Sequence, residues 1–168
     1  GPMSDKFSRN FRHFLWMDKV IYMIDDIAAH KPGHFEWLWH YNGKAVKRGA
    51  DVTVTSDSAS VVIRPLYPRL LALSDFDDLY WEVKKGPTED LKGEEEYYSF
   101  HLPGEHKRVK GLTAVILKDS PDDKDLPMME RTEGKDWIGL KVRRNGKVTD
   151  IYINQLADGR LMHNNSWI

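Results

Sequence analysis

The chain has 168 residues, of which 40% are hydrophobic and 30% charged, as in an ordinary soluble globular protein with one substantial core. Its formal net charge of −1 excludes a global attraction to nucleic acid or to an anionic membrane. Because cysteine is absent, disulfides and thiol chemistry are excluded, and the apolar runs are too short for membrane-spanning helices. Residues 1–3 look like a remnant of tag removal, and 4–168 are predicted to form a single β-sandwich domain.

Short apolar or alternating runs separated by turn residues predict an all-β chain folded as an antiparallel β-sandwich. A turn is predicted at His30 to Gly33, and Asn42-Gly43 is a tight-turn signal. The strand candidates before the last hairpin are Arg12–Met17, Lys19–Ile27, His34–Tyr41, Val52–Val54, Ser60–Arg64, Leu79–Lys84, Glu96–Leu102 and Leu112–Lys118.

An aromatic stripe occupies the run His34–Tyr41, where Phe35, Trp37, Trp39 and Tyr41 share one face of the expected strand. Such a stripe could be a platform on which sugar rings stack. Because aromatic side chains contribute the most to core burial, the preferred interpretation is a sandwich core or a surface that packs on another domain.

The segment Asp119 to Gly134 is polar and is predicted to be a solvated loop. Its acidic residues do not form a calcium site, because no EF-hand spacing or glycine pivot is present to assemble the oxygen ligands that Ca²⁺ needs.

The last hairpin has the clearest pattern, with Asn145-Gly146 as a two-residue turn between Trp137–Arg144 and Lys147–Asn154. This turn fixes the register and sorts the side chains onto two faces. The pairs Ile138/Ile153, Leu140/Ile151 and Val142/Thr149 form the predicted core face. A final strand is expected from Arg160 to Trp167, after a turn at Asp158-Gly159.

The opposite face of this hairpin is the candidate glycan-binding site, made of Trp137, Lys141, Arg143, Tyr152 and Asn154. Aromatic rings can stack on the apolar faces of a sugar, and arginine can grip a carboxylate or sulfate with paired N–H donors. The alternative carries equal weight: an ordinary solvated face on which Lys141 pairs with Asp150 and Tyr152 covers the bare backbone of Gly139.

A second basic patch comprises His106, Lys107, Arg108 and Lys110 and could attract a sulfated or carboxylated chain by charge alone. A solvated strand end is the preferred interpretation of this run.

His34 and His40 lie about 20 Å apart along one strand, which is too far to ligate one metal together. The sequence therefore predicts no metal site and no cofactor.

Three stretches resemble the C-terminal region of the heparinase II/III-like polysaccharide lyases in pattern and order. They are "MDKVIYMIDDI" with "HFEWLWHYNG" in Met17 to Gly43, "VTVTSDSASVVIRPLYP" in Val52 to Pro68, and "WIGLKVRRNGKVTDIYINQLADGRLMHNNSW" in Trp137 to Trp167. The resemblance implies a β-sandwich that follows a helical toroid in enzymes that cleave uronate-containing glycans by β-elimination. The family's catalytic residues come largely from the toroid, and its zinc-site segments do not occur in this chain, so no catalytic or metal residue is carried over.

The resemblance implies a non-catalytic carbohydrate-binding module, secreted or periplasmic, that binds an acidic polysaccharide and works beside the catalytic lyase domain of a parent chain. Chondroitin or dermatan sulfate and hyaluronan are the favoured glycans, and neither nucleic acid nor a membrane is an expected partner. The alternative is a structural domain that braces the toroid without binding on its own. A stand-alone lyase ranks third, because the spacing of His, Tyr and Arg assembles no acid and base set.

Overall fold

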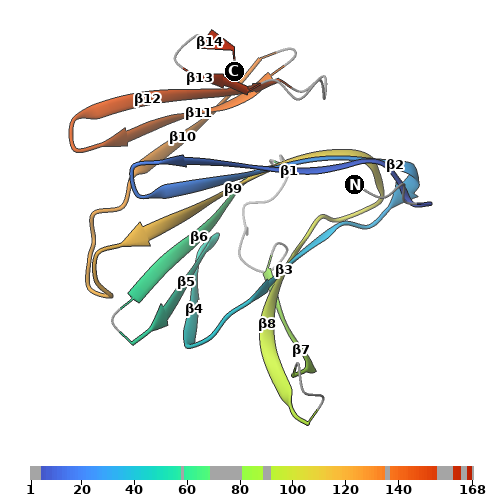
Figure 1. Ribbon diagram of the computed structural model, residues 1–168, viewed down its shortest axis with the longest axis horizontal. Helices are drawn as coiled ribbons and strands as arrows, with labels where there is room; N and C mark the ends of the chain where they lie inside the picture. The colour runs from blue at the N-terminus through green and yellow to red at the C-terminus, as the bar shows by residue number, and fades with distance from the viewer. Residues whose placement is uncertain are drawn as a thin grey trace. The chain divides into compact units, whose positions relative to one another are not determined.

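The computed structural model describes residues 5–57, 59–68, 81–88, 92–134, 137–154, 161–163 and 166–167. Every regular element among them is a β-strand and every strand pair is antiparallel, so the chain is all-β (Figure 1). The two sheets within residues 1–121 face each other in a sandwich-like arrangement. No described residue belongs to a helix that could span a membrane. The chain divides into two compact units, 1–121 and 122–168, and each is described by itself.

The first unit contains a six-stranded sheet in the order β1-β2-β9-β6-β5-β4. The aliphatic and β-branched residues of β2, β6 and β9 favour a pleated, half-buried surface, and the Asn42-Gly43 turn leads into β4. The strands are β1 (Phe7–Met17), β2 (Val20–Gly33), β4 (Lys44–Arg48), β5 (Asp51–Ser56), β6 (Ala59–Tyr67) and β9 (His106–Lys118).

A three-stranded sheet of the same unit, in the order β3-β8-β7, packs on part of one face of the six-stranded sheet. Its strands are β3 (Glu36–His40), β7 (Trp81–Pro87) and β8 (Glu94–His101). The residues of the shared core are Ala29, Phe35, Trp37, Val52, Ile63, Trp81, Tyr98, Phe100, Leu102 and Val109. The aromatic stripe was thus interpreted correctly as core, because Phe35 and Trp37 are buried and Trp39 and Tyr41 pack against the same core cluster.

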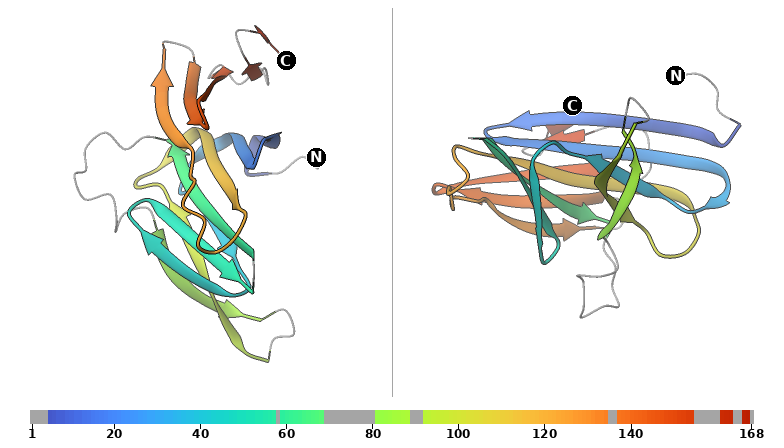
Figure 2. Two further views of the ribbon diagram at one scale, coloured as in Figure 1. Left: turned by 90° about the vertical axis from the view of Figure 1, so that its left-hand side faces the viewer. Right: turned by 90° about the horizontal axis from the view of Figure 1, so that it is seen from below.

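The second unit is a five-stranded sheet in the order β10-β11-β12-β13-β14 (Figure 2). Its strands are β10 (Met128–Glu133), β11 (Trp137–Arg144), β12 (Lys147–Asn154), β13 (Leu161–His163) and β14 (Ser166–Trp167). The predicted register of the hairpin is confirmed from Trp137/Asn154 to Arg144/Lys147. Asn145 and Gly146 both have positive φ, as the predicted type of turn requires.

The prediction of a solvated loop from Asp119 to Gly134 is wrong in its second half, where β10 pairs with β11 from Met128/Arg143 to Glu133/Ile138. The charged residues of β10 hide its alternation, and the strand forms because β11 offers a free edge to its backbone.

The predicted turn at His30 to Gly33 is also replaced by strand, with an irregularity in the pairing of β2 and β9 between Ala28 and Gly33. Pro32 lies inside this irregularity, where its missing N–H costs no ladder bond.

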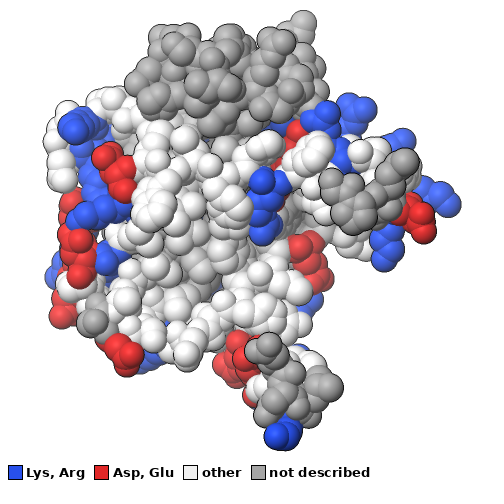
Figure 3. Space-filling model, in the orientation of Figure 1, with Lys and Arg blue, Asp and Glu red and all other residues white. Residues whose placement is uncertain are grey.

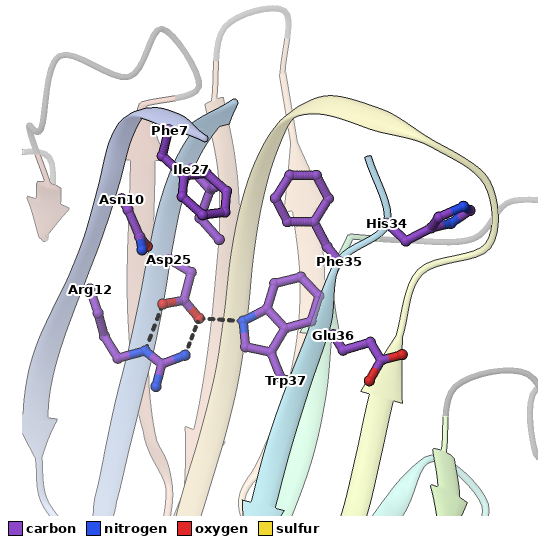
Figure 4. A pocket seen from close by; sticks show the side chains of 9 residues that line it. All are labelled: Phe7, Asn10, Arg12, Asp25, Ile27, His34, Phe35, Glu36 and Trp37. Carbon is purple, nitrogen blue, oxygen red and sulfur yellow. Dashed lines mark hydrogen bonds and ion pairs between the residues drawn. The ribbon is translucent and has the colours of Figure 1, made fainter. Parts of the chain in front are cut away.

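Two consecutive carboxylates of β2 are buried and point to opposite faces of the six-stranded sheet. Asp25 accepts two hydrogen bonds from Arg12 of β1, at 2.7 and 3.1 Å, and one from the indole Nε1 of Trp37 at 2.7 Å (Figure 4). The indole lies over Gly111 of β9, where an added Cβ would come within 3.2 Å of its ring. Asp25 therefore ties β1 and β2 of one sheet to β3 of the other.

On the opposite face, Asp26 lies between two cations of its own. Arg9 Nη1 is 2.7 Å and Lys110 Nζ 3.3 Å from Asp26 Oδ2. Strand alternation thus gives each buried carboxylate a separate set of positive partners, which offsets the cost of removing its charge from water.

We predict that Asp25→Ala lowers the free energy of unfolding by about 3 kcal/mol, because it leaves the Trp37 N–H buried without an acceptor and Arg12 without its counter-ion. Urea denaturation followed by tryptophan fluorescence measures the change. Glu94→Ala, an exposed carboxylate of β8, is the matched control and should change stability by less than about 0.5 kcal/mol. Equal effects of the two substitutions would contradict a structural role for Asp25.

Candidate ligand-binding surfaces

The outer face of the β11–β12 hairpin carries the predicted site residues on one side of the ribbon. Ile138, Leu140, Val142, Ile151 and Ile153 are buried on the other side, so the predicted division into an apolar face and a polar face is confirmed. Trp137, Lys141 and Tyr152 are partly exposed and Arg143 is exposed. Asn154 pairs with Trp137 through the backbone register, and its side chain lies outside the described residues.

Trp137 and Tyr152 form an aromatic pair with ring centroids 4.9 Å apart and planes at 76°, an edge-to-face arrangement. Tyr152 stands opposite Gly139 in the predicted register, and the ring of Trp137 lies 3.3 Å from where a Cβ of this glycine would stand. The carbonyl of Ile151 lies 2.4 Å from the same point. Glycine is therefore required there, because a Cβ would collide with this carbonyl.

The cations of this face differ in their surroundings. Lys141 stands opposite Glu130 of β10 and Asp150 of β12, which places it in a row of alternating charge. Arg143 stands opposite Met128 and Val148, both exposed. Among the described residues, no carboxylate lies within ion-pair distance of Arg143. Its guanidinium is thus the cation on this face that is best placed to meet an anionic ligand.

The second basic patch is divided by the fold. Lys110 contacts the buried Asp26, and His106 Nε2 lies 2.9 Å from the carbonyl oxygen of Pro103. Lys107 and Arg108 are exposed, but consecutive residues of a strand point to opposite faces. The four residues therefore do not present one continuous cationic surface.

A pocket that the sequence did not indicate lies in the first unit, between β1–β2 and β3, with a volume of about 460 Å³ (Figure 4). Its lining residues are Phe7, Asn10, Arg12, Asp25, Ile27, His34, Phe35, Glu36 and Trp37. The acidic pair in the strand "MIDDI", preceded by Arg9 and Arg12, is the only signal that could have pointed to it. These residue types do not reveal that Trp37, which belongs to a different sheet, donates a hydrogen bond to Asp25.

Comparison with known proteins gives a similarity of fold. No protein-family model and no curated protein matches the sequence. A solved structure described as heparinase III matches with a TM-score of 0.61 and 9% sequence identity, over 92% of this chain and 24% of that one. The chain thus shares a fold with heparinase III over about a quarter of that chain's length.

We predict that Gly139→Ala destabilises the second unit by about 2 kcal/mol, because the methyl group would collide with a backbone carbonyl that cannot move without breaking the ladder. Thermal or urea unfolding measures the loss. Gly33→Ala is the control, since no atom lies within 4 Å of its added Cβ. If Gly139→Ala is as well tolerated as Gly33→Ala, the close approach of the Ile151 carbonyl to Gly139 is wrong.

Proposed function

We propose that the chain is a non-catalytic carbohydrate-binding module of a polysaccharide lyase, and that it binds an acidic, uronate-containing glycan on the outer face of the β11–β12 hairpin. The observation that carries this proposal is the aromatic pair Trp137 and Tyr152 on the same face as Arg143, which has no carboxylate partner among the described residues. The fold shared with part of heparinase III supports it.

The binding chemistry follows from the side chains. Pyranose rings have apolar C–H faces that stack on Trp137 or Tyr152, and a uronate carboxylate or a sulfate accepts the paired N–H donors of Arg143. Lys141 adds a weaker contribution, because Glu130 and Asp150 flank it. A sugar polymer that alternates apolar ring faces with anionic groups, such as chondroitin sulfate, dermatan sulfate or hyaluronan, is the ligand that suits this face.

A module of this kind acts by holding substrate near a catalytic domain, which raises the local concentration of cleavable glycan without any chemistry of its own. It would work where extracellular polysaccharides are degraded, as a secreted or periplasmic protein.

A second candidate function is a structural one, in which the chain braces the catalytic domain of a parent protein. The specific observation is a row of apolar residues that runs across the six-stranded sheet from the buried core to an exposed edge. Each residue of this row stands opposite the next one on the neighbouring strand, in the order Trp16, Ile21, Val115, Ile63 and Val52. Val52 and Ile63 lie in the core, whereas the Trp16 side of the row is not covered by the three-stranded sheet.

The exposure of this edge is large for aromatic side chains. Trp16 is 68% exposed and Phe14, two residues away on the same face, is 65% exposed. Figure 3 shows a broad area without Lys, Arg, Asp or Glu over the six-stranded sheet. Because soluble proteins rarely leave such surfaces uncovered, this face favours packing against another domain.

For glycan binding, we predict that Arg143→Ala weakens the affinity for acidic oligosaccharides at least about tenfold, the size of one charge-assisted hydrogen bond. Isothermal titration with chondroitin, dermatan, hyaluronan, heparin and alginate oligosaccharides measures it. The loss should be larger at low salt, since added ions screen the contact.

Lys147→Ala is the matched control for this experiment, because it removes the same charge from the same hairpin on the other face of the ribbon. It should leave affinity nearly unchanged. Absence of heat with every oligosaccharide would rule out the module, and equal losses for the two variants would show attraction by net charge alone.

For the structural candidate, we predict that the isolated chain self-associates through the exposed edge and that Phe14→Ser with Trp16→Ser makes it monomeric. Sedimentation velocity at about 100 µM, where weak contacts are populated, measures the change. Circular dichroism verifies that the variant keeps its fold. A wild-type chain that stays monomeric at this concentration would count against a docking role for this face.

A further inference from the structure

The pocket beside Asp25 combines a charge-neutral polar floor with apolar walls. The floor is the pair of Arg12 and Asp25, whose opposite charges cancel across two hydrogen bonds. Phe7 and Ile27 stand on the side of β1 and β2, and Phe35 and Trp37 stand on the side of β3 (Figure 4). A volume of about 460 Å³ lies within the range of small-molecule sites.

Arg12 and Asp25 still offer hydrogen-bond donors and an acceptor to a ligand, beyond the bonds that they make to each other and to Trp37. Of the five N–H donors of a guanidinium, Arg12 uses one on Nε and one on Nη2, both on Asp25. Asp25 Oδ1 accepts one bond and Oδ2 accepts two, so Oδ1 keeps a lone pair. Asn10, exposed on the same face of β1, adds an amide with both donors and an acceptor. No other described side chain forms a hydrogen bond or ion pair with Arg12, Asp25 or Asn10.

The charge balance decides which ligand class fits. Glu36, at the rim, bonds to Lys84 at 3.0 Å and to Ser99 at 3.2 Å, and the bond from Lys84 holds the pKa of Glu36 below its usual value. The pocket therefore has no excess positive charge to attract an anion. Neutral hydroxyl groups suit it, because each can donate to Asp25 or Asn10 while it accepts from Arg12.

We propose that this pocket binds a neutral pyranose ring, with its hydroxyls on Arg12, Asp25 and Asn10 and its apolar face against the aromatic wall. The site lies wholly within the first unit and does not depend on the hairpin face of the second. The same glycan could supply both ligands, since an acidic polysaccharide that alternates uronate with an uncharged sugar contains a neutral ring in every repeat.

The test is a titration of the full ¹⁵N-labelled chain with methyl β-N-acetylglucosaminide, followed by NMR at the assigned indole N–H of Trp37. This proton binds Asp25 directly, so it reports any ligand that adds to the same carboxylate. A single ring should bind with a Kd of about 1 mM to 10 mM. Methyl β-glucuronide should bind at least about fivefold more weakly than methyl β-glucoside, because these two sugars differ only in the charged carboxylate. Absence of a shift at about 50 mM, or equal binding of the glucuronide, would overturn the proposal.

Two variants make the result specific. Asn10→Ala should weaken binding at least about fivefold, since it removes hydrogen bonds to the ring without touching the fold. His13→Ala, an exposed neighbour that the sheet register places on the opposite face of β1, should leave the affinity unchanged. An unchanged affinity in Asn10→Ala would overturn the assignment.

Arg143→Ala separates this site from the hairpin surface. It should leave the Trp37 shift intact, and Asn10→Ala should leave the binding of acidic oligosaccharides to the hairpin intact. A loss of the Trp37 signal in Arg143→Ala would contradict a pocket that is independent of the hairpin.

Discussion

The first unit depends on one buried carboxylate. Asp25 stands in the middle of an apolar strand, where an unpaired charge would cost several kcal/mol, and three hydrogen bonds from two sheets make its position tolerable. Because Trp37 must reach Asp25, the strand β3 is held at a fixed place on the six-stranded sheet, and Gly111 leaves the space for the indole. The same contact closes one wall of the pocket and leaves the free donors of Arg12 facing into it.

Aromatic rings over glycine recur in both units and explain much of the local geometry. Trp37 lies over Gly111 in the first unit, and Trp137 lies over Gly139 in the second. In the first unit the missing side chain lets an indole approach a strand of the facing sheet, and in the second it lets an indole approach the backbone two residues along its own strand. The consequences differ: Trp37 is buried in the core, whereas Trp137 stays partly exposed and pairs with Tyr152.

The surfaces that remain exposed differ in chemistry. The hairpin face offers rings beside Arg143, which has no carboxylate partner in the part of the chain that the structure describes, and we propose an anionic sugar as its ligand. The edge at Phe14 and Trp16 offers apolar area with little polarity, which suits a protein partner. The pocket offers neutral polar groups between aromatic walls, which suits an uncharged ring. The pocket and the exposed aromatic residues Phe14 and Trp16 lie on the same face of β1, because Asn10, Arg12, Phe14 and Trp16 alternate with the residues of the opposite face.

The sequence by itself determined the antiparallel all-β class, the register of the β11–β12 hairpin and the burial of Phe35 and Trp37. Those features follow from local rules, because alternation assigns faces and an Asn-Gly turn fixes which residues stand opposite each other. Only the tertiary structure decided that β10 is a strand, that Lys110 is bound to Asp26, and that Arg12, Asp25 and Trp37 meet. Those contacts join residues from separate strands, and in the case of Trp37 from separate sheets, so no periodicity along the chain encodes them.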